Sequence, residues 1–342
     1  MKDISIVGLD LAKRVFQVHA AGRDGAAVLR RKLSRGQLLT FFAGLPRCTV
    51  AMEACATAHY WAREIGQLGH EVRLIPPAYV KPFVKRQKND AADAEAIVEA
   101  ALRPSMRFVV PKTKGQQASS MIFRTRDLFV RQRTQLINAL RAHLAEHGVI
   151  APQGVGNLAL LTQIVEDDSA GLELLVVETA RLYLEQIDML SSRIVSLEKV
   201  LRSEAKRSES TVRLMSMPGM GPITAMAIEA FAPTMTTFRR GRDFAAWLGL
   251  VPKQHSSGGK QVLGRTSKMG QRDIRRLLII GAMTVIRWAC RKAPPANSWV
   301  ARMLARKPRM LVAIALANKM ARSIWAMMTK NESYRDSGLA AA

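Results

Sequence analysis

The stretch ISIVGLD at residues 4–10 is the first strand-like segment of the chain. It is an apolar run that ends in an acid, which is typical of a strand buried in a sheet. Two further strand-like segments follow closely, VFQVHA at 15–20 and AAVLRRKL at 26–33, with the turn GRDG between them. Three strands joined by such short connections are expected to form an antiparallel meander.

Two more strands are predicted, CTVAMEA at 48–54 and HEVRLI at 70–75. The helices expected to lead into them lie around residues 36–44 and 58–68. Strands reached through helices join by right-handed crossovers and lie parallel to the first strand. Asp10 and Glu53 would then stand at the carboxyl ends of parallel strands, where α/β sheets place their sites.

A helix that begins near Asp90 adds two acids to this edge. In RQKNDAADAEA at residues 86–96, Asp90 and Asp93 are three residues apart, so their carboxylates face the same way on a helix. Either this is a solvated helix start, with Asp90 as the N-cap, or a cation fills it. The four carboxylates are expected to converge, and oxygen ligands of this kind suit Mg²⁺, with Mn²⁺ as the alternative.

The charge of the chain is strongly positive. Its 342 residues include 52 Lys and Arg against 27 Asp and Glu, a net charge of +25. This excess indicates a nucleic-acid partner, with a generally basic surface as the alternative. The three cysteines show no metal-binding spacing and fit a reducing compartment. Without a signal peptide or an apolar run of about 18 residues, we expect no membrane partner and a cytoplasmic, nucleoid-associated bacterial protein.

The middle of the chain is predicted to be helical. One helix is expected from about residue 116 to 147, and a second lies within 172–205. In the second, apolar residues recur in steps of four and three, the pattern of a coiled coil or a long helical hairpin, although an ordinary packed helix fits equally well. These residues are Tyr183, Ile187, Leu190, Ile194, Leu197 and Leu201. The repeat favours a homo-oligomer, either a dimer or a tetramer.

A glycine-containing turn opens the last part of the chain. In MPGMGPITAMAI at residues 217–228, Gly219 and Gly221 allow a tight turn before a helix. Its backbone N–H groups and the helix N-terminus could hold a phosphate, as in the helix-hairpin-helix motif of DNA-binding proteins. Similar turns also simply join helices, so both interpretations stay open.

A serine-containing segment, HSSGGK at residues 255–260, is predicted to be a basic loop. Most serines in such loops have no catalytic role, but a Ser hydroxyl activated by a base or a metal is a nucleophile. Gly258 and Gly259 would let the backbone approach a phosphate closely. The cations that would neutralise this phosphate are Lys260, Arg265 and Lys268.

Five motifs together resemble the DEDD transposases of insertion-sequence family 110, the group that includes the Piv/MooV-type DNA invertases. They are VGLDLAK with Asp10, AMEACATAHYWA with Glu53, KNDAADAEAI with Asp90 and Asp93, PGMGPITA, and GLVPKQHSSGGKQVLGRTSKMG. The resemblance implies an α/β RNase H-like (RuvC-like) domain with a helical coiled-coil insert and a mostly α C-terminal domain. The implied parts are a catalytic domain at 1–150, a coiled-coil or helical linker at 151–208, a transposase domain with the serine loop at 209–330, and a flexible tail at 331–342.

The resemblance also implies the chemistry. Asp10, Glu53, Asp90 and Asp93 would be the catalytic, metal-binding acids, and Ser257, directly before the glycine, would attack DNA and form a phosphoserine. Ser256 is adjacent, so the nucleophile could be either serine. The implied partners are donor and target DNA, a structured guide RNA from the element, and further copies of the chain, whose serine completes the carboxylate site of another.

Two other classes of protein stay open on the residues alone. A hydrolytic nuclease, such as a junction resolvase, would use the four acids and water and would need no serine. A non-catalytic nucleic-acid-binding protein would need neither the acids nor a metal ion.

Overall fold

The computed structural model describes residues 4–85, 90–291 and 298–335, and of Asp90 only the backbone. The chain divides into two compact units, Met1–Lys114 and Gly115–Ala342. Residues 115–150, which were predicted above as the end of the catalytic domain at 1–150, pack with the second of these units. The reason is that they form most of a long helix whose apolar side chains, such as Phe123 and Ile137, pack into the cores of that unit.

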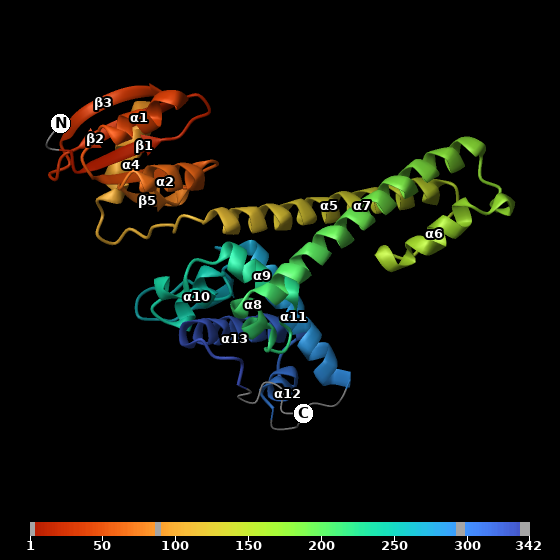
Figure 1. Ribbon diagram of the computed structural model, residues 1–342. Helices are drawn as coiled ribbons and strands as arrows, with labels where there is room; N and C mark the ends of the chain where they lie inside the picture. Colours follow the sequence, from red (N-terminus) through yellow and green to blue (C-terminus); the bar gives the residue numbers. More distant parts are fainter. Residues whose placement is uncertain (1–3, 86–89, 292–297, 336–342) are drawn as a thin grey trace. The chain divides into compact units, whose positions relative to one another are not determined.

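The first unit is built on one five-stranded sheet (Figure 1). Its strands are β1 (Ile6–Asp10), β2 (Val15–Ala21), β3 (Ala27–Ser34), β4 (Thr49–Glu53) and β5 (Glu71–Ile75). They lie in the order β3-β2-β1-β4-β5. β2 is antiparallel to both β1 and β3, whereas β1, β4 and β5 are parallel. The predicted meander and the predicted parallel strands are both confirmed.

Helices cover both faces of this sheet. They are α1 (Leu38–Ala43), α2 (Ala58–Gln67), α3 (Pro77–Val80) and α4 (Asp90–Ala101), with 3₁₀ turns at Arg35–Gln37 and Lys81–Phe83. Because strand side chains alternate between the two faces, Leu9 and Met52 are buried with α1 and α2. Ile6 and Ala51 point to the opposite face and pack against α4.

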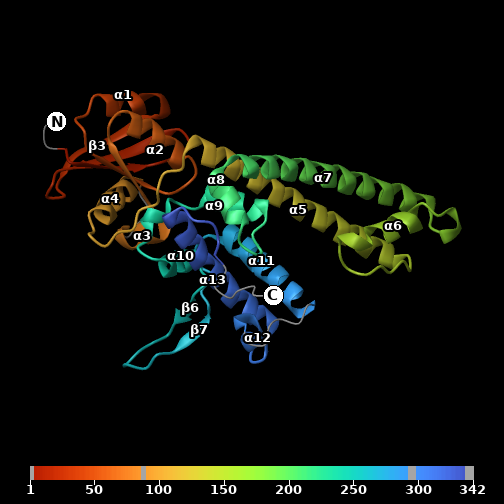
Figure 2. The ribbon, with the colours of Figure 1, turned by 60° about the horizontal axis from the view of Figure 1, so that its bottom comes forward.

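Long helices dominate the first part of the second unit. They are α5 (Lys114–Glu146), α6 (Leu158–Val165) and α7 (Leu174–Arg207), with 3₁₀ turns at Val155–Asn157 and Asp168–Ala170. α5 and α7 run side by side (Figures 1 and 2). Arg126 on α5 donates to Glu198 Oε1 on α7 with Nε at 2.9 Å, and Arg133 donates to Ser191 Oγ at 3.2 Å. Residue numbers rise along α5 as they fall along α7 in these two contacts, so the two predicted helices form an antiparallel pair. α6 and its flanking turns connect them.

The rest of the second unit is a helical body with a β-hairpin. Its elements are α8 (Glu209–Met215), α9 (Pro222–Phe231), a 3₁₀ turn (Met235–Thr237), α10 (Gly241–Trp247), β6 (Pro252–Gln254), β7 (Leu263–Thr266), α11 (Arg272–Arg291), α12 (Trp299–Leu304) and α13 (Arg309–Lys330). By length and composition α13 could cross a membrane, but 44% of its apolar window is buried within the protein. Its Leu316, Met320 and Ile324 lie in the core, so α13 is the central helix of this body.

Candidate active site

Two of the predicted acids stand side by side at the carboxyl ends of neighbouring parallel strands. Leu9 in β1 pairs with Met52 in the parallel strand β4, and the next residues of the two strands are Asp10 and Glu53. Since both follow residues that point to the α1 and α2 face, Asp10 and Glu53 point to the face covered by α4. Both side chains are half-buried.

Helix α4 brings a third acid to the same edge. A side-chain carbon at Gly8, two residues before Asp10, would collide with the carbonyl oxygen of Ala94 and lie 2.7 Å from Cγ2 of Val98. The backbone of β1 therefore touches α4 directly, and a side chain at residue 8 would prevent this. The contact fixes the first turns of α4 over the end of β1, where Asp93 precedes Ala94 in sequence.

The electrostatics of the site reflect this proximity. Burial, and then the Asp93 carboxylate, raises the pKa of Glu53 above its usual value. Burial also raises the pKa of the Cys55 thiol, with further contributions from Glu53 and Asp10. Glu53 therefore lies within electrostatic range of Asp93, and Cys55 within range of both Glu53 and Asp10. Repulsion between the Glu53 and Asp93 carboxylates favours a bound cation.

The donor set suits a hard divalent cation, which prefers carboxylate oxygens. Among the side chains that the structure describes, which exclude Asp90, no three His, Cys, Asp or Glu stand close enough to hold a metal ion together. The structure thus brings Asp10, Glu53 and Asp93 to one edge without closing them into a ligand shell. The predicted role of Asp90 falls outside the described side chains, although its backbone begins α4 as predicted.

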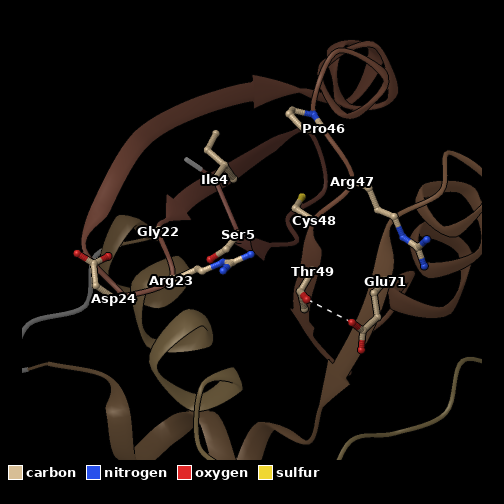
Figure 3. A pocket seen from close by; sticks show the side chains of 10 residues that line it. All are labelled: Ile4, Ser5, Gly22, Arg23, Asp24, Pro46, Arg47, Cys48, Thr49 and Glu71. Atoms are coloured by element: carbon tan, nitrogen blue, oxygen red, sulfur yellow. Dashed lines mark hydrogen bonds between the residues drawn. The ribbon is translucent and has the colours of Figure 1, made fainter. Parts of the chain in front are cut away.

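A hollow of about 830 Å³ lies at the opposite edge of the sheet (Figure 3). Its lining includes Ser5, Thr49 and Glu71, which precede or begin the parallel strands β1, β4 and β5. The Thr49 hydroxyl donates to Glu71 at 3.4 Å within it. Because the acids stand at the carboxyl ends of the same strands, this hollow is separate from their site.

The serine segment is a β-hairpin rather than the predicted loop. β6 and β7 pair antiparallel, and the ladder extends to the tip, where the N–H of Lys260 donates to the carbonyl of Ser257 at 3.1 Å. The two residues between them, Gly258 and Gly259, have φ of 56° and 76°. Two successive positive φ values form the type I′ turn that matches strand twist, which explains why this polar stretch folds back on itself.

The two serines have different surroundings on this hairpin. Ser256 Oγ accepts a hydrogen bond from the backbone N–H of Val262 at 3.2 Å. Within the described part of the chain, the Ser257 hydroxyl has no hydrogen-bond partner. Both residues are exposed, so the hydroxyl of Ser257 is accessible for a reaction.

The predicted phosphate-binding turn lies between α8 and α9. Gly219 has φ of 83°, and a side-chain carbon there would lie 2.8 Å from the carbonyl oxygen of Gly281 on α11. Close packing against α11 thus explains why residue 219 is a glycine. Gly221 is exposed as the N-cap of α9, with open space around it.

Sequence reasoning missed two features near the acids. Gly8 lies inside a strand, where an isolated glycine indicates a close backbone approach, and this signal was present in the sequence. Thr57, which precedes α2, has φ of 73°, a left-handed conformation that is rare for a β-branched residue. No sequence pattern indicates that strain.

The fold and the site together define an enzyme of the RNase H-like class, with acids at the carboxyl edge of a five-stranded sheet. The DEDD transposase model of IS110-type elements matches residues 7–149, and the IS116/IS110/IS902 transposase model matches residues 212–296. The chain belongs to this IS110/IS116/IS902 family of insertion-sequence transposases, enzymes that cut and recombine DNA.

Relatives of nearly the same length support this assignment. A probable family 20 transposase of Pseudomonas aeruginosa is 47% identical over 97% of this chain and 99% of its own length. The transposase for IS1328 of Yersinia enterocolitica is 40% identical over 96% and 98%, respectively. The transposase for IS1111A of Coxiella burnetii is 38% identical over 98% and 92%.

Proposed function

We propose that this transposase moves its insertion sequence by serine-dependent strand exchange. The Oγ of Ser257 attacks a DNA phosphodiester, a bond forms between Oγ and phosphorus, and the bond from phosphorus to a deoxyribose oxygen breaks. The resulting phosphoserine keeps the energy of the ester bond. Attack by another deoxyribose hydroxyl then releases the serine and joins new strands without ATP.

One observation carries this proposal, namely the exposed hydroxyl of Ser257 at the tip of a basic hairpin, which has no hydrogen-bond partner among the residues that the structure describes. Ser256 is the weaker candidate because its Oγ is held by the N–H of Val262 at 3.2 Å. The positively charged Lys260 lies opposite Ser257 across the turn, and a backbone β-bridge joins the two residues. Together with Arg265 and Lys268 it is suited to neutralise the attacked phosphate.

The acids supply the second half of the proposed site. Asp10, Glu53, Asp90 and Asp93 would hold Mg²⁺, with Mn²⁺ as the alternative, and a bound cation stabilises the negative charge that develops on phosphorus. Burial, and then the Asp93 carboxylate, raises the pKa of Glu53, and this supports the role because a bound cation would stabilise the charged form that both effects disfavour. The acids belong to the first unit and the serine to the second. In this proposal the serine of one copy of the chain acts with the acids of another copy.

The partners in this proposal are donor DNA, target DNA and a structured guide RNA. The net charge of +25 supports contacts to nucleic-acid backbones, which carry no sequence information. A guide RNA would then provide the choice of site by base pairing. Gly221, with Gly219 two residues before it, would place the N-terminus of α9 against one phosphate. The enzyme would act in the bacterial cytoplasm as a dimer or tetramer.

Strand exchange by matched serine variants tests this function. We expect Ser257→Ala to abolish recombination between donor and target DNA while nucleic-acid binding is retained, and Ser256→Ala to remain active. A hydrolytic nuclease would instead cut DNA in the Ser257→Ala variant whenever Mg²⁺ is present. A normal rate of recombination by Ser257→Ala would exclude the serine mechanism.

A further inference from the structure

The two serines of the hairpin project from opposite faces. Gln254 pairs with Leu263, the N–H of His255 donates to the carbonyl of Val262 at 2.9 Å, and Ser257 pairs with Lys260. Residues directly opposite each other share a face, and alternate residues along a strand share it as well. His255, Ser257 and Lys260 therefore lie on one face, and Ser256 lies on the other.

A glycine on the opposing strand confirms where the imidazole lies. A side-chain carbon at Gly264 would be 2.8 Å from both Cδ2 and Nε2 of His255. The imidazole of His255 thus occupies the space above Gly264, on the same face as Ser257. Gly264 does not have the positive φ that would itself require glycine, so its small size matters because it leaves room for the imidazole.

We propose that His255 is the catalytic base that removes the proton from Ser257 during attack on DNA. This inference rests on the serine mechanism proposed above. An imidazole nitrogen can accept a proton as a general base, whereas the Lys260 ammonium has no free lone pair and serves the phosphate. The two residues are separated by two strand steps, about 7 Å, which a rotation of the imidazole away from Gly264 can bridge.

The proton balance of the step is simple. As Oγ of Ser257 bonds to phosphorus, its proton passes to a neutral imidazole nitrogen of His255, and the departing deoxyribose oxygen takes a proton from solvent. When the joined product is released, the imidazolium returns its proton to Oγ. The incoming deoxyribose hydroxyl gives its own proton to solvent, so the enzyme ends in its starting state.

Formation of the covalent adduct tests this role. Full-length protein, purified with its bound RNA, is mixed with Mg²⁺ and labelled DNA that carries an end of the element, and the adduct is followed on denaturing gels. We expect His255→Ala and His255→Gln to slow adduct formation about 100-fold, the lower range for a lost general base. DNA binding should be unchanged, and free imidazole in the buffer should restore part of the rate of His255→Ala.

Controls separate the possible failures. Gln261→Ala, on the opposite face of the same hairpin, should form the adduct at the normal rate. A normal rate in His255→Ala or His255→Gln, or a slow rate of His255→Ala that imidazole does not raise, would overturn the role of His255. Ser257→Ala is run in parallel: an adduct formed by that variant would refute the serine mechanism itself, which the His255 results alone do not test.

Discussion

The substitution Gly8→Ala tests whether the contact between β1 and α4 positions the acids. The added carbon would lie 2.7 Å from Cγ2 of Val98 and 3.3 Å from the backbone nitrogen of Val98, and it would also overlap the carbonyl oxygen of Ala94. Carbon atoms pack at about 3.5–4.0 Å, so the first of these contacts is too short by about 1 Å. Because Ala94 meets it through backbone, the helix itself must move.

The size of the effect follows from that displacement. Overpacking of this kind costs about 1–3 kcal/mol of unfolding free energy. A shift of about 1 Å in a catalytic group lowers the rate about 100-fold. We therefore expect Gly8→Ala to destabilise the first unit modestly and to reduce Mg²⁺-dependent DNA cleavage strongly, because Asp93 moves with α4 relative to Asp10.

Two assays on the same samples measure these changes, chemical denaturation followed by circular dichroism and cleavage of labelled donor DNA. Gly66→Ala is the matched control, since Gly66 lies in α2 with open space around it. Alanine is favoured over glycine inside a helix by about 0.5–1 kcal/mol, so this control should be slightly more stable and fully active. Normal stability and cleavage in Gly8→Ala would refute the proposed contact.

Three further substitutions probe other parts of the molecule. The raised pKa of Glu53 means that ionisation of this carboxyl destabilises the metal-free fold, so stability is lost as the pH rises through that pKa. In EDTA, Glu53→Gln should therefore raise the melting temperature at pH near 7. At pH near 4, where the carboxyl is mostly protonated in both states, the same substitution should change the melting temperature little. Glu198→Ala leaves the half-buried Arg126 without its carboxylate and should cost about 1–3 kcal/mol in denaturant titrations. Gly259→Val, at φ of 76°, should disrupt the hairpin tip and abolish adduct formation while the melting temperature stays unchanged.

The sheet could be predicted from sequence because its signals are local. The apolar runs that end in Asp10 and Glu53 specify buried strands, and the short or helical connections between strands specify their direction. Asp93 could be placed only approximately from the sequence. Its position depends on how closely α4 approaches Gly8, and this contact exists only in the packed domain.

The second unit was harder to predict, for physical reasons. The heptad spacing within 172–205 identified α7. A long helix such as α5 can pack on either neighbouring unit, so no sequence pattern decides with which of the two residues 115–150 pack. The hairpin around Ser257 is polar and exposed, so no hydrophobic periodicity marks its strands. Its register depends on backbone hydrogen bonds and on the positive φ of Gly258 and Gly259.

We propose that a serine on the hairpin and acids on the sheet act together on one DNA phosphate. Mass spectrometry of the DNA-linked peptide, after trapping with Mg²⁺ and digestion, measures this most directly. We expect a nucleotide on Ser257 in the enzyme without substitutions and none in Asp10→Asn. A nucleotide on Ser256 or on any other residue, or an adduct that forms equally well in Asp10→Asn, would contradict it.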